Sequence, residues 1–77
     1  MDVAQRIQNG RNLLDAGNEK AANRELTDAV VECRDPRQAS EIRQLAERGL
    51  EMTGRFGKGR WRELARIADL RVGASLH

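Results

Sequence analysis

The stretch Glu32-Cys33-Arg34-Asp35-Pro36-Arg37-Gln38 (residues 32–38) contains the sharpest structural boundary in the chain. Pro36 cannot continue a helix that arrives from the N-terminal side, because it lacks a backbone N–H and disfavours helical geometry at the preceding residue. The same proline suits the first position of a new helix, and Asp35 can cap that helix, with Gln38 at the capping-box distance. We therefore predict that one helix ends and another begins here.

Apolar and small residues recur at helical spacing on both sides of this boundary. The helix before it is predicted over about 19–33, with Asn18 as N-cap, and the helix after it over about 36–53, ending at Thr53-Gly54. The predicted apolar faces consist of Ala22, Leu26, Ala29, Val30 and Cys33 on the first and of Ala39, Ile42, Leu45, Ala46, Gly49 and Leu50 on the second.

Two further helices are predicted towards the ends of the chain. One covers about 3–15, between Asp2 as N-cap and Gly17, and the other covers about 60–72, after a glycine-rich loop over 55–59. No segment alternates with a period of two, so we predict no strand. Because the connections are short, we expect an all-α fold of four short helices paired as two antiparallel αα-hairpins.

Length and composition predict a single helical domain over residues 1–77. Apolar residues make up 39% of the chain and charged residues 34%, so the core is thin and association with itself or another chain would stabilise it. No apolar run reaches the ~20 residues that a membrane span needs, and the N-terminus lacks a signal-peptide pattern. One cysteine cannot form an internal disulfide, so we expect a cytoplasmic protein without membrane contact.

The chain contains no pattern typical of catalysis or of metal binding. No pattern of His, Asp or Glu residues around Cys33 suggests a nucleophile, and His77, the one histidine, is the last residue. Gly57-Lys58 lacks the earlier glycine and the following hydroxyl residue of a phosphate-binding loop. We therefore expect no enzyme activity, no metal and no cofactor.

Basic residues are concentrated in the second half of the chain. Residues 1–36 contain seven acidic and five basic residues (7 − 5, net −2), and residues 37–77 contain five acidic and nine basic residues (9 − 5, net +4). The segment 55–62 holds four of these bases and both aromatic residues, and arginines in a first helical turn oppose the helix dipole. The candidate partner-binding residues are Arg55, Phe56, Lys58, Arg60, Trp61 and Arg62.

Two interpretations are open for the aromatic residues Phe56 and Trp61. Either they pack inward and close the end of the core, with the arginines solvated, or they contact a partner. A contact role predicts a small non-enzymatic protein–protein interaction module that binds an acidic or helical protein segment or a second copy of itself. The alternative is a nucleic-acid-binding protein, because bases stack on aromatic rings while lysine and arginine contact phosphates.

The first hairpin resembles a tetratricopeptide repeat. Gly10, Ala22 and Ala29 stand at the family's small-residue spacings, Leu26 stands where the family has a large apolar residue, and 54–59 is similar to its turn. Arg6, in contrast, occupies the usual tryptophan position. The resemblance implies a stack of αα-hairpins that binds protein segments. Independently, a helical Gly10 costs ~1 kcal/mol relative to alanine, which close approach of the next helix would offset.

The segment 63–74 is similar to the helix-turn-helix of the tetracycline-repressor family, in which an alanine-rich helix meets a turn before a Val-Gly-small sequence. Asp69 replaces the usual turn glycine. The five residues after Val72 are also too few for a recognition helix of about two turns.

Overall fold

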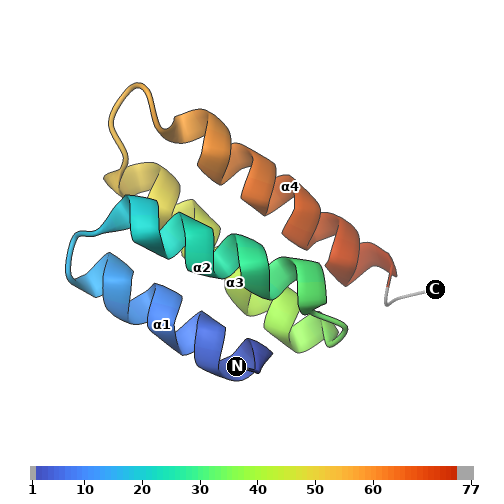
Figure 1. Cartoon of the computed structure of the whole chain (residues 1–77). Coiled ribbons are helices and arrows are strands. Elements are labelled where there is room, and N and C mark those ends of the chain that lie inside the picture. The colour runs from blue at the N-terminus through green and yellow to red at the C-terminus, as the bar shows by residue number, and fades with distance from the viewer. Residues whose placement is uncertain (1, 75–77) are drawn as a thin grey trace.

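The computed structural model describes residues 2–74, which form four helices and no strand (Figure 1). The helices are α1 (Val3–Asp15), α2 (Glu19–Glu32), α3 (Pro36–Met52) and α4 (Lys58–Ala74). The predicted all-α fold is therefore confirmed. The largest boundary difference is at α4, which begins two residues earlier and ends two residues later than predicted, so Lys58, Gly59, Gly73 and Ala74 are helical.

The predicted caps form at the starts of the first three helices. Asp2 accepts a hydrogen bond from the Gln5 backbone N–H at 2.7 Å, and Asn18 accepts one from Ala21 at 3.5 Å. Asp35 caps α3 by accepting from the Arg37 N–H at 2.9 Å. Side-chain oxygens in these positions satisfy backbone donors that have no partner inside the helix.

The turn between α1 and α2 depends on Gly17, whose φ is +80°. A side chain at this φ is strained, although a methyl group there would meet no atom within 4 Å. We expect Gly17→Ala to lower the free energy of unfolding by about 1 kcal/mol, measured by urea denaturation followed by circular dichroism. Gly59→Ala is the matched control, because its methyl group also enters open space but on a helix without positive φ. Equal midpoints for both variants would contradict the predicted strain.

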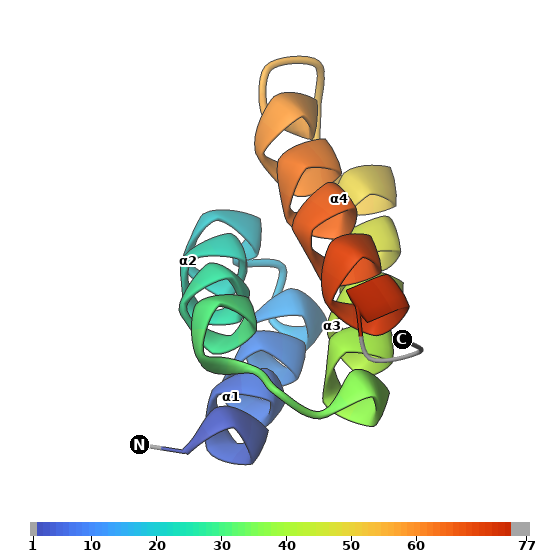
Figure 2. The ribbon, with the colours of Figure 1, turned by 90° about the vertical axis from the view of Figure 1, so that its right-hand side faces the viewer.

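The four helices are arranged as two hairpins, α1 with α2 and α3 with α4, which share the most extensive contacts. Viewed along the helices, the two pairs lie side by side (Figure 2). Helix α2 also packs against α3 and α4, and α1 also packs against α3. The Arg11–Glu41 and Arg48–Asp15 ion pairs show that α1 and α3 run in the same direction.

The core is formed by the apolar faces that the sequence predicts. Gly10 is buried, and a Cβ atom at this position would lie 2.6 Å from the Leu26 side chain, so the predicted close approach of α1 and α2 is confirmed. The buried apolar residues are Ile7, Leu14, Ala22, Leu26, Ala29, Val30, Cys33, Ala39, Ile42, Leu45, Ala46, Trp61, Leu64 and Ala68.

Helix α4 is continuous from Lys58 to Ala74, so no turn forms at Asp69. The segment 63–74 therefore does not have the two-helix geometry that its resemblance to a helix-turn-helix implies. Each of the helices in the described part of the chain is too short or too polar to pass through a lipid bilayer.

Candidate functional site

Trp61 lies in the core. Of the two interpretations that the sequence leaves open, inward packing and contact with a partner, the structure therefore shows the first for this residue. Its side chain is 0% exposed, and it packs against Gly49 of α3, where a Cβ atom would come within 2.5 Å of the indole ring. The indole Nε1 donates a hydrogen bond to Glu19 Oε2 at 2.8 Å. Trp61 is therefore not one of the residues that can contact a partner.

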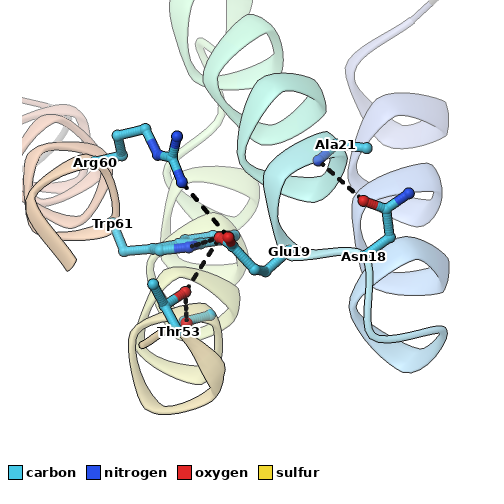
Figure 3. Close-up of polar contacts among 7 residues, drawn as sticks. Asn18, Glu19, Ala21, Thr53, Arg60 and Trp61 are labelled. Atoms are coloured by element: carbon cyan, nitrogen blue, oxygen red, sulfur yellow. Dashed lines mark hydrogen bonds and ion pairs between the residues drawn. The ribbon is translucent and has the colours of Figure 1, made fainter. Parts of the chain in front are cut away.

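Glu19, the first residue of α2, links the two hairpins (Figure 3). Besides the bond from Trp61, its carboxylate lies 3.1 Å from the Thr53 hydroxyl and 3.5 Å from Arg60 Nη2. The helix dipole favours a carboxylate at this position. We refer to Glu19, Thr53, Arg60 and Trp61 as the Glu19 cluster. Sequence reasoning missed it, because Glu19 is 42 residues from Trp61 and resembles any acidic residue in a first helical turn.

The Glu19 cluster supports the turn between α3 and α4. Thr53 is buried, and its hydroxyl also lies 2.7 Å from the Gly49 carbonyl oxygen. Gly57 donates its backbone N–H to the Gly54 carbonyl at 3.2 Å, which closes a tight turn with Arg55 and Phe56 at its centre. A Cβ atom at Gly57 would overlap the Thr53 methyl group, so the turn rests directly on the core.

Phe56 has the opposite environment to Trp61, with 97% of its side chain exposed at the tip of this turn. It lines an open depression of about 310 Å³ together with positively charged side chains from two other segments. The residues that line the depression are Glu19, Lys20, Thr53, Gly54, Arg55, Phe56, Gly57 and Arg60.

The structure thus brings together three of the six candidate residues, Arg55, Phe56 and Arg60, and adds Lys20 from α2. Lys58 is half-buried and donates from Nζ to the Leu50 carbonyl at 3.3 Å, so it caps the end of α3. Arg62 is exposed on α4 outside the residues that line the depression. The contribution of Lys20 carries no sequence signal, because it lies in the acidic half of the chain.

The group of Lys20, Arg55, Phe56 and Arg60, referred to below as the Phe56 face, combines an exposed ring with positive charge. Within residues 2–74, Lys20 and Arg55 form no ion pair, whereas Arg60 is partly neutralised by Glu19. Such a surface can bind an anionic group beside an apolar one. Among residues 2–74, no three His, Cys, Asp or Glu side chains are placed to hold a metal ion.

Comparisons of the chain with protein-family models, with curated proteins and with solved structures found no match.

Proposed function

We propose that the protein is a small, non-enzymatic interaction module that binds an acidic protein segment through the Phe56 face. The observation that carries this proposal is the exposure of Phe56, 97%, on a turn that the Glu19 cluster holds against the core. Aromatic and arginine side chains frequently anchor protein interfaces, and a pre-formed turn loses little conformational entropy on binding. An apolar side chain of the partner would cover the ring.

The charge of the Phe56 face favours an acidic partner. Lys20, Arg55 and Arg60 contribute three positive charges against one carboxylate, that of Glu19. Opposite charges on the partner would speed association and exclude basic segments. The similarity of the first hairpin to tetratricopeptide repeats, which bind protein segments, also supports this function, and the single cysteine supports a cytoplasmic location.

A nucleic acid is the second candidate partner, because an exposed ring beside Arg55 could stack on a base while the arginine contacts a phosphate. Few positive charges at this face are available for phosphates. Arg60 contacts Glu19, which leaves Lys20 and Arg55, and Lys58 is bound to the Leu50 carbonyl. The Glu19 carboxylate also opposes a dense row of phosphates. These contacts make the protein segment the leading proposal.

Replacing Phe56 with serine tests the proposed function. The probes are fluorescein-labelled decapeptides rich in Asp and Glu, with one leucine at each position in turn, and the same peptides with Asn and Gln instead. We expect the wild-type chain to prefer the acidic set, and Phe56→Ser to weaken the best peptide about tenfold, with an unchanged melting temperature. Fluorescence anisotropy measures binding, and thermal circular dichroism measures stability.

Val31→Ser is the matched control, because Val31 is 62% exposed near the other end of α2 and should not affect binding. Equal affinity of the wild-type chain and Phe56→Ser for every peptide would overturn the proposal. Preferential binding of a ten-nucleotide dT oligomer, weakening linearly with the logarithm of salt concentration, would establish the nucleic-acid alternative instead.

A further inference from the structure

A second hollow, of about 320 Å³, adjoins the Phe56 face on the surface between α2 and α4. Lys20 and Arg60 line both depressions, so the two form one continuous surface. Helices α2 and α4 run in the same direction: Arg60 contacts Glu19 near their N-termini, and Arg71 donates to the Val31 carbonyl near their C-termini. The residues that line this α2–α4 hollow are Lys20, Asn23, Arg24, Thr27, Asp28 and Arg60.

Asn23 is the unusual residue of the hollow. Its side chain is 9% exposed, and its Nδ2 atom is buried without a hydrogen-bond partner in the described part of the chain. It lies beside Ala22 on the buried side of α2, three residues before the fully buried Leu26. A buried donor without a partner destabilises the folded state by about 1–3 kcal/mol, so an apolar residue at position 23 would give a more stable fold.

The other buried atoms without hydrogen-bond partners in residues 2–74 have an electrostatic explanation that Asn23 lacks. Arg6 Nε and Glu25 Oε2 belong to side chains of opposite charge, which approach to 3.9 Å. Asp28, although it lines the hollow, is paired with Arg6 at 3.5 Å. The unsatisfied amide of Asn23 therefore lies next to a hollow whose remaining charges are positive.

We infer that the α2–α4 hollow binds a carboxylate side chain of the partner, with Lys20, Arg24 and Arg60 supplying the positive charge. Asn23 Nδ2 donates a hydrogen bond to that carboxylate and so fixes the register of the segment. This inference rests on the proposed function, since it specifies an Asp or Glu beside the residue that covers Phe56. Nδ2 is covered in the free chain, so binding includes a small rearrangement of the hollow, whose charged side chains are exposed.

Asn23→Leu tests the inference, because leucine keeps the branched shape of the side chain and carries methyl groups in place of the amide oxygen and nitrogen. We expect the urea midpoint of Asn23→Leu to rise, since the unsatisfied donor is removed, while its affinity for the best acidic decapeptide falls about tenfold, as for one hydrogen bond to a charged group. If Asn23 had only a structural role, Asn23→Leu would lower the urea midpoint or leave the affinity for the peptide unchanged. Either result would contradict the inference. The side-chain amide resonance of Asn23 should also shift when the peptide is added to the wild-type chain.

Arg24→Ala gives a second measurement that does not alter the buried surface. It should weaken the same peptide several-fold, whereas Arg37→Ala, which removes an equal charge from the exposed start of α3, should not. If Phe56→Ser weakens binding but Asn23→Leu and Arg24→Ala do not, the inference fails and the proposed function stands. If no peptide binds and the Asn23 resonance does not move, both fail. A larger shift of that resonance with inorganic phosphate than with the peptide would overturn the assignment to a carboxylate.

Discussion

Replacing Trp61 with alanine is expected to lower the free energy of unfolding by about 3–5 kcal/mol. Trp61 is the largest of the fully buried side chains, and its removal leaves a cavity between α4 and Gly49 and takes away the indole donor to Glu19. A loss of this size approaches the whole stability of a small domain, which is about 0.05–0.15 kcal/mol per residue. The measurement is urea denaturation followed by far-ultraviolet circular dichroism.

Trp61→Phe separates the two contributions of the tryptophan. The phenyl ring retains most of the packing but removes the donor to Glu19, and we expect a loss of about 1–2 kcal/mol. Arg62→Ala is the control, since Arg62 is the next residue in the chain and is exposed. If Trp61→Ala unfolded at the urea midpoint of Arg62→Ala, Trp61 would not be a core residue. Ready quenching of the wild-type tryptophan emission by iodide would also contradict the burial of the ring.

Most of the fold was predictable because its signals are local. A cap depends on residues within three positions of it, as in the bond from the Gln5 N–H to Asp2, and an apolar stripe depends on spacing within a single helix. The break at Pro36 likewise needs no knowledge of the rest of the chain. These signals fix where helices begin and which face is buried, and the short connections then restrict how the helices pair.

The candidate site was less predictable because its parts meet only in the folded chain. Lys20 and Asn23 belong to the first hairpin, and no spacing within α2 reveals that they lie beside Arg60 of α4. Nothing in the sequence distinguishes Lys58 from the other basic residues of 55–62, yet its Nζ donates a hydrogen bond to the Leu50 carbonyl. Charge clustering singled out the segment 55–62 but could not separate a base that caps a helix from bases that face an open surface.

Of the two aromatic residues, Trp61 carried a usable signal. Trp61 has the spacing of the apolar face that continues through Leu64 and Ala68, all of which are buried. Phe56 precedes that helix and stands within a turn bounded by Gly54 and Gly57, where its side chain is exposed. Helical periodicity places Trp61 on the apolar side of its helix, but it cannot be applied to Phe56, which lies outside the periodic segment.

Gly49→Ala is expected to lower the free energy of unfolding by about 2–3 kcal/mol, even though alanine is favoured in a helix by about 1 kcal/mol. The added methyl group would lie 2.5 Å from three atoms of the Trp61 ring. The ring has little room to retreat, because it is fully buried and its Nε1 is bonded to Glu19. Gly73→Ala, a helical substitution with no atom within 4 Å of the new methyl group, should not destabilise the chain.

The size of this effect depends on the ring, so Gly49→Ala and Trp61→Ala should not be additive. With the ring removed, the Gly49 methyl group enters the vacated space, and the same substitution is expected to be neutral or stabilising. A double-mutant cycle by urea denaturation measures this coupling. A Gly49→Ala cost that persisted unchanged in the Trp61→Ala background would show that the cost does not arise from contact between the new methyl group and the indole ring.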